Sequence, residues 1–171
     1  MKTNKEIKKE IAAELKEAGY NSRKVSVSVK DSGYSTRIDV TIKDPTVNAQ
    51  AIEAIANKHD SYKLDERTGE ILLGGNTYVF VAYKYGIFDE IASDYLAEAE
   101  KAMQHMAAAH QSVEPIRDNL RLIKGAQDKN YTVETVEEIN GFRIPGMRRL
   151  VGNAQELAKY IAMYTLAGTI F

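Results

Sequence analysis

The sequence predicts an α+β protein in which a helix–hairpin–helix–strand layer, with an antiparallel sheet, precedes an all-helical C-terminal half. Lys24–Lys30 and Arg37–Lys43 place apolar residues at every second position, as half-buried strands do. Thr77–Tyr83 is apolar on both faces, which is typical of a strand buried from both sides. From Phe88 onward the apolar residues recur at helical spacing instead.

The first element is an amphipathic helix over Asn4–Ala18, ended by Gly19 as a C-cap. Its apolar stripe recurs every four residues, at Ile7, Ile11 and Leu15. Its N-terminal end is rich in lysine, at Lys2, Lys5, Lys8 and Lys9. We interpret these lysines as a solvated surface rather than a phosphate-binding strip, because Glu6 and Glu10 interrupt the basic run.

The next elements form an antiparallel hairpin followed by a short helix. The turn signal Asp31–Tyr34 joins strands Lys24–Lys30 and Arg37–Lys43. Asp44–Thr46 ends the second strand, since its proline cannot donate to a central ladder. Asn48–His59 is then predicted to be a short helix with one buried stripe.

The fold is expected to depend on residues 62–83, which complete the sheet. Asp65–Gly69 is predicted to be a tight polar turn, and Glu70–Leu73 a short strand. Gly74–Asn76 is interpreted as a hairpin turn or bulge, because it is too short for a phosphate-binding loop. Thr77–Tyr83 follows as the strand buried inside the sheet.

Four helices are predicted in the remainder of the chain. The first spans Phe88–Ala109. The second starts at the N-cap candidate Ser112, tolerates Pro115 in its first turn and stops at Gly125. After a polar loop over Ala126–Asn130, the third runs from Thr132 to Ile139, and the breaks Asn140–Gly141 and Pro145–Gly146 follow. The fourth covers Met147–Ala167 and is capped by Gly168.

Length and composition restrict the classes of protein. The 171 residues suit one good-sized domain or two small ones that share an interface. We expect two, at 1–85 (α+β sheet domain) and 86–171 (helical domain packed on it). The net charge of -1 gives no overall attraction to DNA or anionic membranes. The absence of cysteine excludes disulfides, thiolate metal sites and cysteine nucleophiles. With no secretory signal and no apolar run of membrane-spanning length, we expect a cytoplasmic protein without a membrane partner.

No motif in the chain predicts a catalytic or metal site. His105 and His110 are five residues apart and therefore fall on different sides of a helix, so we expect no metal. None of the serines lies in a Gly-x-Ser-x-Gly elbow, and no cofactor motif is present. Asp65 and Glu70, or the cluster 134–138, would supply paired carboxylates only if they were buried together. We therefore predict no catalytic residue and no cofactor.

The candidate binding residues are arginines and a glycine-rich loop. Arginines interleaved with apolar residues over 142–149 suit contact with a nucleic acid or an acidic protein surface. Placed at the start of a helix, such cations would oppose its dipole, which favours the contact interpretation. The complete set of candidates is Arg67, Gly74, Gly75, Asn76, Arg143, Arg148 and Arg149.

A family resemblance complements these predictions. Residues 25–83 contain a Val-x-Val strand, an Arg-x-Asp-Val-Thr-Ile-Lys-Asp-Pro strand and stop, then Asp-Glu-Arg-Thr-Gly-Glu-Ile-Leu and Gly-Gly-Asn-Thr-Tyr-Val. This pattern resembles the large polyvalent protein-associated domains, class twenty-nine, of phages and conjugative elements. The match is carried by Asp44, Pro45, Asp65, Thr68, Gly69, Glu70, Gly74, Gly75, Asn76, Thr77 and Tyr78. The resemblance implies a mobile-element origin and names no catalytic residues, and it does not extend to residues 86–171.

These observations predict a non-enzymatic interaction protein of phage or mobile-element origin. Its expected partner is a host or mobile-element protein, and inhibition of a host defence component, as anti-CRISPR proteins do, is one such role. A nucleic-acid-binding accessory protein is the first alternative. The second is an enzyme with a carboxylate site between the two halves.

Overall fold

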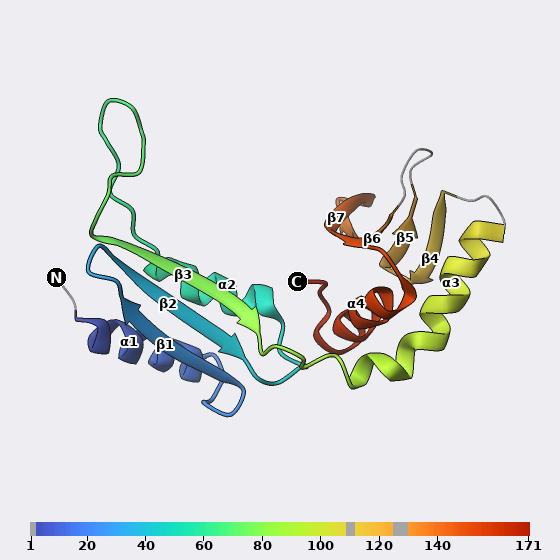
Figure 1. Ribbon diagram of the computed structural model, residues 1–171, viewed down its shortest axis with the longest axis horizontal. Coiled ribbons are helices and arrows are strands. Elements are labelled where there is room, and N and C mark those ends of the chain that lie inside the picture. The colour runs from blue at the N-terminus through green and yellow to red at the C-terminus, as the bar shows by residue number, and fades with distance from the viewer. Residues whose placement is uncertain (1–2, 109–111, 125–129) are drawn as a thin grey trace. The chain divides into compact units, whose positions relative to one another are not determined.

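A computed structural model describes residues 3–108, 112–124 and 130–171 (Figure 1). The chain divides into two compact units, Met1–Tyr85 and Gly86–Phe171. We call these the N-terminal unit and the C-terminal unit and describe each by itself.

The N-terminal unit is a three-stranded sheet with two α-helices on one face (Figure 1). Its elements are α1 (Asn4–Glu17), β1 (Val25–Asp31), β2 (Ser35–Ile42), α2 (Ala49–Ala56), the 3-10 helix η1 (Asn57–His59) and β3 (Asn76–Tyr83). The strand order is β1-β2-β3, with β1 antiparallel and β3 parallel to β2. The predicted antiparallel sheet is therefore wrong, because α2 acts as a crossover that returns the chain to the end at which β2 began.

Local sequence explains why α1 forms and which face it buries. Thr3 and Glu6 form a capping box at its N-terminus, which satisfies backbone N–H groups that have no partner within the helix. Ile11 and Leu15 are buried in the unit's core. The opposing sheet contributes the alternating residues predicted for β1 and β2, and α2 contributes Ile52. The hairpin and both helices of this unit are thus confirmed, and no helix of its described residues covers the other face of the sheet.

The strand β3 lies at an edge of the sheet, not inside it as predicted. Phe80 is 46% exposed on the open face. Aromatic residues are tolerated there because they pack laterally: the rings of Tyr62 and Tyr78 are 5.4 Å apart. Part of the outer edge of β3 is satisfied locally, since the backbones of Ser61 and Thr77 pair. The apolar sequence of Thr77–Tyr83 therefore does not correspond to a strand buried on both faces of the sheet.

The segment 62–75, which we call the arm, projects from the sheet before β3 (Figure 1). The predicted strand Glu70–Leu73 is reduced to a single bridge between Leu64 and Ile71. The predicted turn is present, with the Asp65 N–H donating to the Glu70 carbonyl at 2.8 Å and the Gly69 N–H donating to the Asp65 carbonyl at 2.9 Å. The arm is therefore a small hairpin with almost no ladder.

The C-terminal unit contains a four-stranded antiparallel sheet, so the predicted all-helical half is wrong. Its elements are the 3-10 helix η2 (Ile91–Tyr95), α3 (Leu96–Ala108), β4 (Val113–Arg117), β5 (Leu120–Ile123), β6 (Tyr131–Ile139), β7 (Phe142–Val151) and α4 (Ala154–Ala167). The strands follow chain order, β4-β5-β6-β7. The core is formed by α3 and α4 against one face, on which Leu120, Leu122, Val133 and Val151 are buried.

Two segments of this unit that were predicted to be helices are strands. The prediction was wrong because the spacing of their apolar residues resembles that of a helix. Ile116, Leu120 and Ile123 mimic helical spacing, but Ile116 belongs to β4 and the other two to β5. In β6 a register shift between Glu134 and Val136 interrupts the alternation.

The signal for a hairpin was the Asn140–Gly141 dipeptide, whose φ values of 53° and 79° suit a tight turn between β6 and β7. Of the predicted helix Met147–Ala167, only the part from Ala154 is helical, and its caps Asn153 and Gly168 are well formed. The predicted helix Phe88–Ala109 begins later, as η2 and α3.

Some predictions concern residues outside the described ranges. They include Lys2, Ala109, His110, Gly125 and most of the loop Ala126–Asn130. Among the described helices, none has the length and apolar character needed to cross a bilayer.

Candidate interaction surfaces

The tip of the arm is held by one carboxylate. The Asp65 side chain accepts hydrogen bonds from the Thr68 N–H at 2.8 Å and the Arg67 N–H at 2.9 Å. These bonds lower the pKa of Asp65 below its ordinary value of 3.8, and the bond from Thr68 has the larger effect. Asp65 therefore shapes the turn and leaves the Arg67 side chain exposed at the tip.

The base of the arm is held by Asn76, which is only 3% exposed. Its side-chain oxygen accepts from the Lys63 N–H at 2.8 Å, and its amide donates to the Leu72 carbonyl at 2.8 Å and to the Tyr78 hydroxyl at 3.2 Å. Gly74 and Gly75 precede it with φ of 89° and 73°, a conformation that favours glycine. The structure thus places these three candidate residues where they attach the arm to β3.

The arm also exposes four aliphatic side chains, and none of these four was among the candidates predicted from the sequence. Leu73 is 100% exposed, and the exposed side chains around it are Leu64, Ile71 and Leu72. Their signal was present in the Ile-Leu-Leu run itself, which was predicted to be a strand and hence partly buried.

The open face of the N-terminal sheet carries charges that neutralise one another. Arg37 donates to Asp39 at 2.7 Å, and Lys30 lies 4.0 Å from the same carboxylate. The Arg37 guanidinium also lies 4.4 Å from the centre of the Phe80 ring. This face therefore presents a short, internally paired set of polar groups.

The open face of the C-terminal sheet differs, and the strand registers define it as two rows. One row joins Val113, Ile123, Thr132 and Leu150 across the four strands, and we call it the apolar row. The neighbouring row joins Pro115, Arg121, Glu134 and Arg148, and we call it the charged row. Leu150 is 71% exposed. Both rows face away from the core, because the intervening Leu122 and Val133 point into it.

Glu134 is the centre of the charged row, with a side chain that is 0% exposed. One oxygen accepts from Arg121 Nε at 2.8 Å and Nη2 at 2.5 Å, and the other accepts from Arg148 Nε. Burial of a carboxylate is costly unless charge-assisted hydrogen bonds of this kind satisfy its oxygens. The two arginines are thereby held in place, and the negative charge of Glu134 offsets part of their positive charge.

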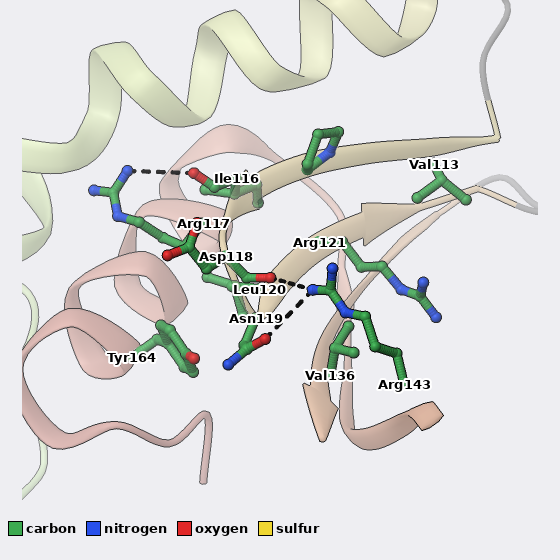
Figure 2. A pocket seen from close by; sticks show the side chains of 11 residues that line it. Val113, Ile116, Arg117, Asp118, Asn119, Leu120, Arg121, Val136, Arg143 and Tyr164 are labelled. Carbon is green, nitrogen blue, oxygen red and sulfur yellow. Dashed lines mark hydrogen bonds between the residues drawn. The ribbon is translucent and has the colours of Figure 1, made fainter. Parts of the chain in front are cut away.

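A hollow of about 1030 Å³ adjoins this face at the β4–β5 turn. Figure 2 shows Arg143 reaching from β7 to that turn, where its guanidinium donates to the Asp118 carbonyl and to Asn119 Oδ1, the latter at 3.3 Å. Arg117, also at the hollow, donates to Glu98 of α3 through Nη2 at 2.8 Å. Among the described residues, no carboxylate contacts the Arg143 side chain, so its charge is available in the hollow.

The three candidate arginines of β7 do not form one patch. Arg148 lies in the charged row, and Arg143 at the hollow. Arg149, adjacent to Arg148 on the strand, points to the opposite face, where its side chain donates to the Arg148 carbonyl at 2.9 Å. Arg121 and Glu134 were not among the predicted binding residues, because helices were expected there, and Glu134 was considered only as one of the clustered carboxylates 134–138. The alternation Leu-Arg-Leu was the available signal.

Carboxylates and histidines elsewhere form pairs rather than clusters. His59 lies 3.2 Å from Glu14, and His105 lies 2.8 Å from Glu114. In the ranges 3–108, 112–124 and 130–171, no three histidine or acidic side chains gather as metal ligands would. Asp65 and Glu70 share the tip of the arm, where the Asp65 carboxylate is occupied by backbone N–H groups.

No protein-family model, curated protein or solved structure matches the chain. Function is therefore inferred from the surfaces themselves.

Proposed function

We propose that the chain is a non-enzymatic interaction protein of a phage or mobile element, and that the open face of its C-terminal sheet binds a host protein. The observation that carries the proposal is the apolar row beside the charged row. Large exposed apolar groups next to arginines are the composition of protein interfaces. Leu150, 71% exposed near the C-terminal end of β7, would be an anchor side chain.

The chemistry of this face favours a protein over a nucleic acid. A phosphate backbone is bound by several uncompensated cations. Here Arg121 and Arg148 share the buried Glu134. The apolar row next to them has no counterpart on a phosphate surface. These contacts instead suit a partner with an apolar patch.

The hollow beside the open face favours a partner that carries a negative charge. Arg143 presents a guanidinium anchored by the β4–β5 turn, at the side of the open face that carries Val113 and Pro115. An aspartate or glutamate of the partner could pair with it, since guanidinium and carboxylate match in geometry. The partner surface is thus apolar with an acidic rim.

The mobile-element origin is supported by the resemblance of residues 25–83 to the large polyvalent protein-associated domains. Small freestanding phage proteins often act by binding a component of host defence. We therefore propose a component of host defence as the partner, with inhibition as the outcome.

The test combines capture, mapping and a defence assay. Purified chain is immobilised and incubated with nuclease-treated host lysate, and the captured protein is mixed with the free chain for amide hydrogen exchange. We expect a stoichiometric partner that protects β5 and β7, and restored phage plating on defended cells that express the chain. Capture from untreated lysate but not from nuclease-treated lysate, or protection restricted to the N-terminal unit, would overturn the proposal.

Matched variants sharpen this test. Leu150→Asp should reduce partner affinity by about 100-fold, because it replaces the proposed apolar anchor with a charge. Leu73→Asp, on the arm, makes the same change at a side chain that is 100% exposed and should leave affinity unchanged. Equal affinity of the two variants would exclude the open face as the binding surface.

A further inference from the structure

A groove in the N-terminal unit lies along the free edge of β1, on the side next to α1. It measures about 520 Å³ and is lined by α1, by the turn 20–22 and by the start of β1. Its floor includes Leu15, Val25 and Val27, all of which are buried. It belongs to neither surface used in the proposed function.

The strand edge beside this groove has backbone groups directed outward. β1 is the first strand of the order β1-β2-β3, so β2 pairs with it on one side only. The Lys43 N–H donates to the Lys24 carbonyl, and the Ser32 N–H donates to the Ser35 carbonyl. The even-numbered residues of β1 therefore direct their backbone N–H and C=O groups to β2. Successive residues of an antiparallel pair alternate, so Val27 and Val29 direct their N–H and C=O groups to the free edge. An edge of this kind is a template for another strand.

The opposite wall is a strongly basic flank of α1. Lys8, Ala12 and Lys16 line the groove at successive turns of the helix. At about 100° per residue, Lys5 and Lys9 fall on the same flank. The glutamates of α1 fall on the other flank, at Glu6, Glu10, Glu14 and Glu17. The contact between Glu14 and His59 confirms that the acidic flank faces η1, away from the groove.

The remaining charges near the groove do not cancel this field. Lys43 lies at the end nearest Tyr20, where its Nζ donates to the Ser22 carbonyl at 2.6 Å. The residues that line the groove include three lysines and no carboxylate. Asp31 lies at the far end of β1, where it accepts from the Gly33 N–H at 2.8 Å and from Asn4 Nδ2 at 3.4 Å.

We infer that this groove binds an extended acidic peptide segment, which adds to the sheet as a strand beside β1. Backbone pairing with Val27 and Val29 supplies affinity, and the lysines of α1 select acidic side chains on the peptide face that points to the helix. A second copy of the chain is a poorer occupant, since symmetric pairing of two β1 edges would bring two lysine flanks together.

The first test uses short fluorescein-labelled peptides and fluorescence anisotropy with the full chain. A peptide of alternating glutamate and valine should bind, and the matched peptide of lysine and valine should not. Alternate N-methylation of the acidic peptide removes hydrogen bonds on one edge only. One N-methylated register should therefore abolish binding, and the other should retain it. This test changes only the peptide and leaves the protein unaltered.

Protein variants test the charge requirement. Lys8→Glu/Lys16→Glu should weaken binding of the acidic peptide at least about tenfold, because two attractive charges become repulsive. Lys58→Glu/Lys84→Glu makes the same change in net charge on exposed residues outside the groove and should bind as the original chain does. Hydrogen exchange should show new protection at the amides of Val27 and Val29.

Several results would overturn the inference. Equal binding of the two N-methylated registers would mean that charge alone holds the peptide, and equal weakening by both double variants would place it elsewhere. A dimer of the free chain with protected Val27 and Val29 amides would identify a second copy as the occupant. Each result is independent of the Leu150→Asp test, so failure here leaves the proposed function standing.

Discussion

The two units share one arrangement, a sheet with helices on one face, but their open faces carry different groups. In the described part of the chain, each covers one face of a sheet with helices and leaves the other face without one. On the open face of the N-terminal unit, Arg37 and Lys30 meet Asp39, whose side chain is 24% exposed. On that of the C-terminal unit, Arg121 and Arg148 meet Glu134, whose side chain is 0% exposed. A carboxylate that pairs with two cations on the open face of a sheet can thus be either partly exposed or fully buried.

The largest expected effect tests this difference directly. Glu134→Ala should lower the free energy of unfolding of the C-terminal unit by about 2 kcal/mol, since two arginines lose a buried acceptor; their own partial exposure keeps the loss below that of a fully buried pair. Asp39→Ala should cost the N-terminal unit about 0.5 kcal/mol or less. Urea titrations read by hydrogen exchange would follow each unit separately. Equal losses would contradict the comparison.

A second variant compares the arm with the β6–β7 hairpin. Asn76→Ala removes all three side-chain bonds at the base of the arm, and we expect local destabilisation of about 2 kcal/mol. Amides of residues 62–75 should then exchange faster, while those of the β6–β7 hairpin, held by ladder bonds, stay unchanged. If the arm keeps its protection, Asn76 is not what attaches it.

A third prediction concerns Tyr83, whose hydroxyl donates to the Val47 carbonyl at 2.6 Å. Tyr83→Phe should destabilise the N-terminal unit by about 1 kcal/mol. Burial raises the pKa of Tyr83 from 10.0 to about 12. The neutral hydroxyl is therefore the form the fold favours, so stability is unaffected below pH 10 and falls as the pH rises through that window. Tyrosinate absorbance, compared with the Phe variant, would detect a normal pKa and refute this.

The smallest effect is expected at the tip of the arm. The lowered pKa of Asp65 means that its ionised form supports the turn above the ordinary value of 3.8, and that this support is lost as the pH falls below it. The Arg67 and Thr68 amide signals should shift in NMR spectra over that acid range. Asp65→Asn should remove the pH dependence. A transition at or above the ordinary value would show that the backbone N–H bonds do not favour the carboxylate.

The sequence predicted the N-terminal unit well because its signals were local. Strict alternation in residues 24–43 identified the β1–β2 hairpin, and the apolar stripe of residues 4–18 identified α1. What it missed there was pairing: nothing in Thr77–Tyr83 states whether a strand lies at an edge or runs parallel to its neighbour. Those properties arise from the crossover and depend on contacts between distant residues.

The C-terminal unit was mispredicted where strands depart from regular alternation. Val133, Glu134, Thr135 and Val136 are consecutive and all buried, so β6 has no period of two to recognise. The candidate site suffered accordingly: Arg148 was selected for its neighbours in sequence, whereas its partner Glu134 is a neighbour only across the ladder. A residue such as Arg149 could not be assigned to a face without knowing that the segment is a strand.

The parallel pairing of β2 and β3 has a kinetic consequence. The C-terminal sheet is a meander in which each strand joins the one before it, so every step closes a short loop. The N-terminal sheet is complete only when Asn76–Tyr83 returns across α2 and the arm to meet Ser35–Ile42. Long-range closure of this kind is slow compared with hairpin formation. Refolding of the whole chain should accordingly show a fast phase from the meander and a later phase in which the third strand docks.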